Sequence, residues 1–547
     1  MRIALAQINL HVGHFEENTR QIIQTIRQAE SAGADLVVFS ELTICGYPPK
    51  DLLYYEEFLQ QCRDGIEEIA TYCKNIAAIV GGPDPNPRPQ GNRLYNAAFF
   101  LEKGRIAHTY HKGLLPTYNV FDEGRYFEPA ISFQTIPFMG HKIALTICED
   151  IWNLNQQPLY DHNPMDFMMT EQPDLMINIS ASPFSWNRVV ERMATVSENA
   201  RNYKLPLFYV NQYGAQAELI FDGGSAVFDP SGNLVEAFEP FSPGLKIYDL
   251  QQVIQGKGTT VPSTISAEQK NRLIHQALVL GIRNYFSKLG IRQAIVGLSG
   301  GLDSALVLVL AVQALGNDNV RAVLMPGPFS TDHSVKDALQ LAENLGVKHD
   351  TISIDPIVST LEQTLEPWFK ETPFGIAEEN LQARARAVVL MGLSNKFGPM
   401  VLNTSNKSEA AVGYGTLYGD MAGGLSVIGD VYKTEAYDLA RYINTLQPLI
   451  PENILTKPPS AELRPDQKDT DSLPEYEVLD AILFRYIEQH MGPGQIVAAG
   501  YDSGLVARVI RMVNASEYKR MQAPPILRVS SRAFGSGRLM PLAAKYF

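Results

Sequence analysis

The sequence is poor in cysteine, in basic charge and in long apolar runs. Only 4 of its 547 residues are cysteine and none forms C-x-x-C, which argues against a disulfide scaffold and a structural zinc site. The formal net charge of −13 argues against a broad nucleic-acid-binding surface. No apolar run approaches the roughly 18 residues that span a bilayer, and residues 1–18 do not resemble a signal peptide. We therefore expect a cytoplasmic protein that binds neither nucleic acid nor membrane.

The first half of the chain is patterned as a sheet-rich α/β domain. The length of the whole chain, 547 residues, predicts two domains. Apolar runs typical of buried strands include 2–8, 34–41 and 142–150, and hairpins are expected at 94–112 and 225–238, with a helix at 18–33. Residues 251–268 are polar and rich in glycine, threonine and serine, which predicts a linker between domains at 1–250 and 269–547.

The second half alternates strands and helices more regularly. We predict strands at 293–299, 320–327, 349–354 and 399–405, and helices at 270–290, 303–316, 334–346 and 378–396. This alternation predicts a doubly wound parallel sheet. The proline-rich, charged segment 457–474 predicts a mobile loop above a functional site.

A glycine-rich stretch, GLSGGLDS at 297–304, joins a predicted strand to a predicted helix. Such a loop can hold an anion, but the lysine of an ordinary P-loop is missing. Gly297, Ser299 and Gly301 also match the G-x-S-x-G nucleophile elbow, yet no later histidine lies in a convincing strand-end loop. Asp303, at the start of the helix, suits either a helix cap or a magnesium ligand.

Residues 299–304 resemble the SGGxDS loop of the PP-loop ATP pyrophosphatases. In that family the loop grips pyrophosphate, and ATP is cleaved between its α and β phosphates, so no P-loop lysine is needed. Four later stretches are similar to signatures of the NAD synthetase family: ENLQARAR from 379, NTSNKSE from 403, GDVYK from 429 and KPPSA from 457. Each alone could be a charged helix face or a polar loop, but their shared order argues against coincidence.

The resemblance implies a reaction and a set of contacts. The nicotinate carboxylate of deamido-NAD attacks the α-phosphorus of ATP, and ammonia then displaces AMP from the acyl-adenylate. Magnesium ligands are expected at Asp303 and Glu409, and no other cofactor is expected. Deamido-NAD contacts are expected at Asn380, Glu409 and Lys519. ATP contacts are expected at Gly297, Leu298, Ser299, Gly300, Gly301, Leu302, Asp303, Ser304, Thr404, Lys433 and Ser460, the last a threonine in many synthetases of this family.

Three polar residues of the first half, Glu41, Lys112 and Cys148, stand at predicted strand ends or turns. Separately they could be an exposed acid, a surface lysine and a buried thiol. Together they resemble the Glu–Lys–Cys pattern of the nitrilase, or carbon–nitrogen hydrolase, superfamily, which implies an αββα sandwich. In such a site the thiolate attacks an amide carbonyl, the glutamate moves protons and the lysine stabilises the oxyanion.

The same resemblance implies that the amide is that of glutamine. Glu123 matches a further family glutamate that positions the lysine or substrate, and Tyr118, Ser182 and Arg188 match positions that hold glutamine. A guanidinium such as that of Arg188 can pair bidentately with the α-carboxylate. Cys45 lies in a predicted turn four residues after Glu41 and is the less favoured nucleophile.

The two halves together resemble the glutamine-dependent members of the NAD synthetase family. Glutamine hydrolysis in the first domain would supply ammonia to the second, which implies a sheltered passage and, as in homologues, a homo-oligomer. The sequence leaves the interface, the passage and the coupling of the sites open. Three alternatives remain: a GMP-synthetase-like amidotransferase, a tRNA-modifying PP-loop enzyme and a non-catalytic metabolite-binding protein. An assay of deamido-NAD against xanthylate, an RNA-shift assay and turnover of ATP to AMP would discriminate them.

Overall fold

The computed structural model describes residues 1–154 and 158–545 and divides into two compact units, Met1–Ile265 and Ser266–Phe547. The segment predicted as a linker from residue 251 instead begins with a helix, α5 (Leu250–Gln255). The Asp249 carboxylate caps its first turn by accepting from the Gln251 and Gln252 N–H groups. Leu250 and Val253 are buried on this helix. This helix lies within the first unit, and the domain bounds 1–250 and 269–547 stay a prediction.

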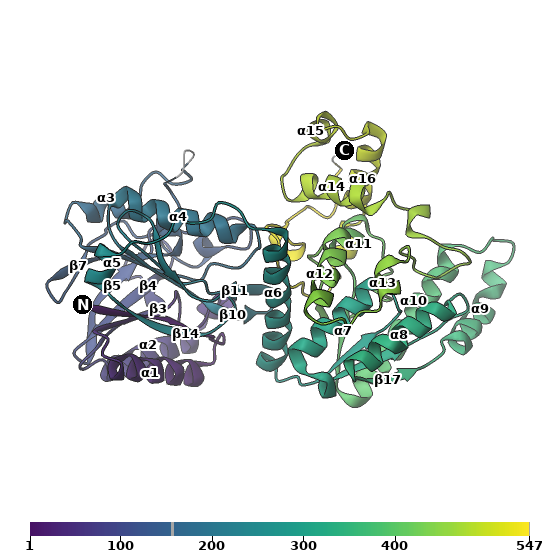
Figure 1. Cartoon of the computed structure of the whole chain (residues 1–547), viewed down its shortest axis with the longest axis horizontal. Coiled ribbons are helices and arrows are strands. Elements are labelled where there is room, and N and C mark those ends of the chain that lie inside the picture. Colours follow the sequence, from purple (N-terminus) through teal and green to yellow (C-terminus); the bar gives the residue numbers. More distant parts are fainter. Residues whose placement is uncertain (155–157, 546–547) are drawn as a thin grey trace. The chain divides into compact units, whose positions relative to one another are not determined.

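The first unit contains two six-stranded sheets, each covered by helices on its outer face (Figure 1). The first sheet has the order β14-β1-β2-β3-β4-β5, with β1 Arg2–Gln7, β2 Leu36–Val38, β3 Ala77–Pro85, β4 Leu94–Glu102, β5 Arg105–His111 and β14 Gly244–Asp249. The second has the order β13-β12-β9-β8-β7-β6, with β6 Ile136–Phe138, β7 His141–Ile147, β8 Leu175–Ser180, β9 Leu207–Asn211, β12 Ala226–Phe228 and β13 Leu234–Ala237. A separate hairpin pairs β10 (Tyr213–Gln216) with β11 (Leu219–Asp222).

Alternation along the strands explains the layers. On β1, Ile3 and Leu5 belong to the core between the sheets, whereas Ala4 and Ala6 pack on the helical side. Helices α1 (Phe15–Ser31) and α2 (Glu56–Tyr72) cover the first sheet. Helices α3 (Pro164–Met169) and α4 (Arg188–Tyr203) lie on the opposite side of the unit (Figure 1). The predicted αββα sandwich is confirmed.

The second unit is built on one parallel sheet of order β17-β16-β15-β18-β19. Its strands are β15 Ala294–Gly297, β16 Val320–Leu324, β17 Lys348–Thr351, β18 Met400–Asn403 and β19 Leu425–Ser426. The chain moves outward from β15 in one direction and then returns to β18 on its other side. Loops leaving the carboxyl ends of β15 and β18 therefore diverge and open a crevice. The predicted doubly wound parallel fold is confirmed.

Helices cover both faces of this sheet. Helices α6 (Ala267–Lys288), α7 (Leu302–Leu315), α8 (Asp332–Leu345) and α12 (Lys433–Leu446) pack together, and α9 (Asp355–Phe369) packs with α10 (Ile376–Phe397). The remaining helices are α11 Lys407–Val412, α13 Glu452–Thr456, α14 Tyr476–Ile487, α15 Pro493–Ala498, α16 Ser503–Ala515 and α17 Glu517–Arg520. A separate apolar cluster joins α11, α14 and α16.

Several predicted strands run longer than the observed ones at their carboxyl ends. The predictions at 34–41, 142–150, 293–299 and 399–405 become β2, β7, β15 and β18, which end at Val38, Ile147, Gly297 and Asn403. Predicted site residues lie within three positions beyond each of these ends, namely Glu41, Cys148, Ser299 and Thr404. Within the described ranges, no helix has the length and apolar content to cross a membrane.

A buried ion pair ties α4 to the hairpin of the first unit. The Arg192 guanidinium makes two hydrogen bonds to the Asp222 carboxylate, and both side chains are almost fully enclosed. Removing one partner would leave an uncompensated buried charge, which costs several kcal/mol.

We predict that Arg192→Met lowers the free energy of unfolding of the first unit by about 3–5 kcal/mol. Lys246→Met is the matched control, because Lys246 pairs with Glu236 at an exposed position and should cost at most about 1 kcal/mol. Urea titration read by hydrogen–deuterium exchange of β9 and β11 reports this unit alone. Equal losses for the two variants would contradict the prediction.

Candidate active sites

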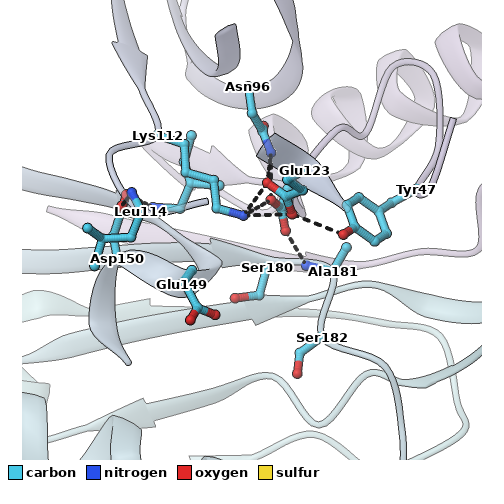
Figure 2. Close-up of polar contacts among 12 residues, drawn as sticks. Tyr47, Asn96, Lys112, Leu114, Glu123, Glu149, Asp150, Ser180, Ala181 and Ser182 are labelled. Carbon is cyan, nitrogen blue, oxygen red and sulfur yellow. Dashed lines mark hydrogen bonds and ion pairs between the residues drawn. The ribbon is translucent and has the colours of Figure 1, made fainter. Parts of the chain in front are cut away.

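The first candidate site is built around Lys112, whose ammonium is fully buried between two carboxylates (Figure 2). Lys112 Nζ lies 2.7 Å from Glu41 Oε1, and 2.9 and 2.8 Å from the two carboxylate oxygens of Glu123. Asn96 Nδ2 donates to Glu41 Oε1 at 2.7 Å, and the Tyr47 hydroxyl donates to Glu123 Oε1 at 2.9 Å. The structure thus brings the predicted Glu41, Lys112 and Glu123 into one hydrogen-bonded group.

Strand ends from the first sheet position these side chains. Glu41 follows β2 in a turn, and its Oε2 accepts the Ala181 N–H at 2.9 Å from the second sheet's side. Lys112 directly follows β5, where its own N–H donates to the Asn96 carbonyl at 2.8 Å. Gly81 permits the Glu41 turn to approach β3, since a Cβ there would lie 2.4 Å from the Leu42 nitrogen.

Cys148 begins the turn that follows β7, a 3-10 segment at Cys148–Ile151. Its φ of 42° lies in the left-handed region, which is unfavourable for a residue with a side chain. The buried Asp150 holds the turn: its Oδ1 accepts the Gly113 and Leu114 N–H groups, and its Oδ2 accepts the Ile147 N–H and the Tyr110 hydroxyl. The thiol is thereby presented at the end of a central strand, next to the segment that follows Lys112.

Charge and burial set the protonation of this site. Burial raises the pKa of the Cys148 thiol well above its ordinary value; Glu41 adds to the rise and Lys112 opposes it. Burial alone would lower the pKa of Lys112, but Glu123 and Glu41 hold it well above its usual range. Burial raises the pKa of Glu123 to about 7 even though Lys112 opposes the rise. A protonated thiol beside a carboxylate and a permanent cation is suited to deprotonation during nucleophilic attack.

A second polar group lies beside Cys148. Burial raises the pKa of Glu149, whose carboxylate accepts the Tyr118 hydroxyl at 3.0 Å to each oxygen and the Tyr160 hydroxyl at 3.1 Å. Arg188 begins α4, lies over the Trp152 ring at 5.3 Å and lowers the pKa of Glu149 through its charge. Sequence reasoning missed Glu149 and Tyr160; the position of Glu149 directly after Cys148 was the available signal.

Of the remaining residues named from the sequence, Ser182 lies near the site and Cys45 lies in the apolar core. The Ser182 N–H donates to Asn211 Oδ1 at 2.8 Å. Ser182 directly follows Ala181, whose N–H donates to Glu41. Cys45 is fully buried in the apolar core under α1 and α2, and burial raises the pKa of its thiol well above the ordinary value. Cys62 and Cys73 belong to the same core, as expected for packing residues.

The second candidate site begins at the loop between β15 and α7. The Ser299 hydroxyl accepts the Gly301 N–H at 3.1 Å and lies 3.0 Å from the Ser304 hydroxyl, so both serines shape the loop. Gly300 has a φ of 83°, and a Cβ there would lie 2.1 Å from the Ser334 carbonyl oxygen. The glycine therefore allows the loop to pass against the start of α8 while the α7 N-terminus faces a cavity.

This cavity has a volume of about 520 Å³. It lies at the carboxyl ends of β15, β16 and β18, where a doubly wound sheet binds its ligands. Most of the predicted ATP residues line it: Gly297, Leu298, Ser299, Gly301, Leu302, Asp303, Ser304, Thr404, Lys433 and Ser460. Residues 457–464 and 466–469 of the predicted loop also line it, whereas the mobility of that loop stays a prediction.

The predicted deamido-NAD residues are more dispersed. Glu409 lines the main cavity and also a second one of about 30 Å³. Lys519 lines only the second, where its ammonium donates to the Gly413 and Gly415 carbonyls at 2.8 and 2.7 Å. Asn380 lines neither cavity and accepts the Thr416 hydroxyl at 2.7 Å.

A lysine again lies between two carboxylates at the centre of the second site. Lys433 Nζ is 2.5 Å from Asp303 Oδ2 and 3.6 Å from Glu409 Oε1. Burial and the charge of Asp303 raise the pKa of Glu409 to about 8, although Lys433 opposes the rise. The two carboxylates converge on the cavity with one cation between them. The two carboxylates could also bind a second cation.

This pair suits a magnesium ion that arrives with a nucleotide. Magnesium in such sites is held by one or two carboxylates together with phosphate oxygens and water. Among the described residues no group of three or more histidine, cysteine or acidic side chains could hold a metal by itself. Asp303 and Glu409 are two carboxylates that border the same cavity, so they are the candidate ligands for such an ion.

Asp480, on α14, connects the elements that carry these side chains. Its Oδ1 accepts the Ser408 hydroxyl at 2.5 Å, and its Oδ2 accepts the Thr434 N–H and hydroxyl at 2.9 and 2.8 Å. The Lys433 N–H in turn donates to the Ser408 hydroxyl at 2.9 Å. One buried aspartate thus holds the first turns of α11 and α12 together. Nothing in the local sequence around Asp480 indicates this role.

Glu462 is a further cavity residue that sequence reasoning missed. Its carboxylate accepts the Thr331 N–H at 3.1 Å and the Thr331 and Ser334 hydroxyls at 2.7 Å each. These contacts fasten residues 457–469 to the start of α8. Asp332, the first residue of α8, lies next to Thr331 in sequence.

Two family models match the chain, one in each unit. The carbon–nitrogen hydrolase model matches residues 2–257, and the NAD synthase model matches residues 274–523. Each match encloses the corresponding candidate site. Only residue 1 and residues 258–273 and 524–547 lie outside the two matches. The chain thus joins a carbon–nitrogen hydrolase unit to an NAD synthase unit.

Relatives of full length join the same two units. Glutamine-dependent NAD(+) synthetases of Synechocystis sp., Acinetobacter baylyi and Thermotoga maritima are 46%, 41% and 39% identical; the matches cover 100%, 99% and 100% of this chain and 99%, 98% and 99% of theirs. A solved glutamine-dependent NAD+ synthetase of Acinetobacter baumannii, in complex with ADP, is 39% identical with a TM-score of 0.78, over 99% of this chain and 98% of that one. The chain belongs to the glutamine-dependent NAD(+) synthetase family and is an enzyme of the ligase type.

The close approach of Gly300 to Ser334 gives a stability prediction. We expect Gly300→Ala to destabilise the β15–α7 loop by clearly more than the about 1–2 kcal/mol that a left-handed alanine costs, because a backbone oxygen blocks the new methyl group. Gly290→Ala is the matched control, since its φ is 70° but nothing lies within 4 Å of the new Cβ. Thermal unfolding and hydrogen–deuterium exchange of residues 294–310 measure the difference. Similar exchange in both variants would contradict the packing argument.

Proposed function

We propose that this enzyme amidates deamido-NAD to NAD, using ATP and ammonia released from glutamine. The observation that carries the proposal is that one chain holds both a buried Glu41–Lys112–Cys148 group and an Asp303–Glu409–Lys433 group facing a nucleotide-sized cavity. The first suits amide hydrolysis, and the second suits polyphosphate chemistry.

In the first unit, Glu41 accepts the proton of the Cys148 thiol as sulfur attacks the carbonyl carbon of the glutamine side chain. The Lys112 ammonium stabilises the oxyanion of the tetrahedral intermediate. Glu41 returns the proton to the amide nitrogen, the C–N bond breaks and ammonia leaves. Water, deprotonated by Glu41, then cleaves the thioester and releases glutamate. Glu123 keeps Lys112 in place through its two short contacts.

Glutamine is held by groups of opposite charge around the thiol. Arg188 is suited to the α-carboxylate, since a guanidinium can pair with it bidentately. Glu149 is suited to the α-ammonium, because its buried carboxylate has only hydroxyl donors in this structure among the described residues. Tyr118 orients Glu149, and Ser182 lies on the segment that follows Ala181.

In the second unit, the nicotinate carboxylate attacks the α-phosphorus of ATP, the bond to the β-phosphate oxygen breaks and pyrophosphate leaves. Ammonia then attacks the acyl carbon, loses a proton and displaces AMP. Residues 297–304 would hold the phosphates through N–H groups, hydroxyls and the α7 N-terminus, which stabilise the leaving pyrophosphate. Lys433 would neutralise negative charge at the reacting phosphates, Asp303 and Glu409 would hold magnesium delivered with ATP, and Thr404 and Ser460 would contact ATP. Magnesium would offset the charge of two approaching anions.

The proposal also includes Asn380 and Lys519 as deamido-NAD contacts, a sheltered passage for ammonia, a cytoplasmic location and a homo-oligomer. Full-length similarity to glutamine-dependent NAD(+) synthetases favours it over the GMP-synthetase-like, tRNA-modifying and non-catalytic alternatives. The direct test supplies glutamine, ATP and deamido-NAD and measures NAD, AMP, pyrophosphate and glutamate in equal amounts. Production of ADP and phosphate, or amidation of xanthylate instead, would refute the proposal.

Cys148→Ala should lower synthesis from glutamine by at least about a thousandfold, because the nucleophile is lost. Synthesis from ammonium salts should stay within about twofold of the parent enzyme, because the chemistry of the second unit needs only ammonia. Cys45→Ala is the matched control and should leave both activities, since Cys45 is a packing residue. Initial rates with each nitrogen source measure this. Loss of both activities in Cys148→Ala would contradict the division into two sites.

Asp303→Asn should lower kcat/KM for ATP by about 10²–10³-fold with glutamine and with ammonium salts alike, because a magnesium ligand and a partner of Lys433 are lost. Asp318→Asn, at an exposed position just beyond the other end of α7, is the matched control. Steady-state rates over a magnesium titration measure the effect. An unchanged magnesium dependence would remove Asp303 from the proposed metal site.

A further inference from the structure

Tyr160 is not among the predicted site residues, yet its hydroxyl contacts the buried Glu149 carboxylate. Tyr160 lies in the segment 158–163, well after Cys148 in the chain, and is half-buried. Its hydroxyl donates to Glu149 Oε1 at 3.1 Å, and the neighbouring Tyr118 hydroxyl reaches both Glu149 oxygens at 3.0 Å. Two tyrosines from separate segments therefore converge on one buried carboxylate.

The hydrogen bonds are distributed unequally over that carboxylate. Glu149 Oε1 accepts from both tyrosines, whereas Oε2 accepts from Tyr118 alone among the described residues. A carboxylate oxygen can accept at two lone pairs, so Oε2 keeps acceptor capacity. No described lysine, arginine or histidine forms an ion pair with Glu149 within 4.0 Å, while buried carboxylates are normally paired with a cation. Glu149 therefore has no directly paired cation among the described residues, and only the charges of Lys112 and Arg188 beyond 4.0 Å act on it.

The segment that carries Tyr160 is itself fixed to the nucleophile turn. Asn153 Oδ1 accepts the Tyr160 N–H at 3.1 Å, and Asn153 Nδ2 donates to the Tyr160 and His162 carbonyls at 2.8 and 3.2 Å. Asn153 follows the Cys148–Ile151 turn by two residues and is buried. The backbone of Tyr160 is therefore fixed to the segment that directly follows the turn presenting the thiol.

We propose that Tyr160 is a specificity-determining residue that, by holding Glu149 Oε1, leaves Oε2 directed at the α-ammonium group of glutamine. This inference rests on the proposed glutaminase function of the first unit. Tyr160 selects an α-amino acid amide over amides that lack the amino group, because such amides would leave the buried Glu149 carboxylate without a directly bound cation. Burial raises the pKa of Tyr160, so its hydroxyl remains a donor at neutral pH.

The test removes one group from the protein and one from the substrate. Tyr160→Phe should raise the KM for glutamine by roughly tenfold or more, as expected for a hydrogen bond to a charged group, with kcat changed far less. With glutaramate, which is glutamine without its α-amino group, the same variant should differ from the parent enzyme by less than about threefold. Synthesis from ammonium salts should be unchanged. Hydrolysis rates for both amides, in the parent enzyme and the variant, measure the coupling between the Tyr160 hydroxyl and the α-amino group of the substrate.

Tyr203→Phe is the matched control, because it removes a tyrosine hydroxyl that donates to the Asp166 carboxylate at 2.8 Å in the same unit. This control should not discriminate between the two amides. Equal losses for glutamine and glutaramate in Tyr160→Phe, or an unchanged KM for glutamine, would overturn the role of Tyr160. Absence of glutamine hydrolysis in the parent enzyme would instead refute the proposed function itself.

Discussion

A buried ammonium group between two carboxylates lies at the centre of each candidate site. Lys112 lies between Glu41 and Glu123 in the first unit, and Lys433 lies between Asp303 and Glu409 in the second. Desolvating a charge is expensive, so these lysines persist only because paired carboxylates surround them. Each pair of carboxylates also carries more negative charge than its lysine can balance. Burial, reinforced by the neighbouring carboxylate, raises the pKa of Glu123 to about 7 and of Glu409 to about 8.

The same charge arrangement serves different chemistry in the two units. In the first, the charges of Glu41 and Lys112 act on a thiol whose pKa is raised by burial, and in the proposed mechanism Glu41 takes its proton when the sulfur attacks. In the second, the carboxylates face a cavity of about 520 Å³ bordered by the α7 N-terminus. An incoming magnesium ion would offset their excess charge, and the lysine would then be available to phosphate. Under the proposed function, one electrostatic design would support proton transfer in one unit and polyphosphate binding in the other.

Both sites occupy strand ends, and this explains where sequence-based prediction succeeded and where it did not. The apolar runs predicted the strands, but the predicted ranges at 34–41, 142–150 and 293–299 included polar residues that leave the sheet. Residues 297–304 could be recognised because they are contiguous, and Glu41, Lys112 and Cys148, which are far apart in the chain, only because they resemble a family pattern. Asp480 and Glu462 could not, because each acts through side chains more than 40 residues away in the chain. The helix at Leu250–Gln255 was missed because two apolar residues in one turn give no periodic signal.

The sequence by itself determined the two α/β folds, the identity of the candidate reacting groups and the absence of an ordinary P-loop lysine, because apolar periodicity and short motifs are local properties of the chain. Only the tertiary structure decided which charged groups interact, since burial and distance set each pKa and each ion pair. It showed that both Cys45 and Cys148 are buried, but that the charges of Glu41 and Lys112 act on Cys148. It also revealed Glu149 held by Tyr118 and Tyr160, a contact between residues that no spacing rule connects. Convergence of distant polar groups on one buried point depends on packing, and a linear pattern does not encode it.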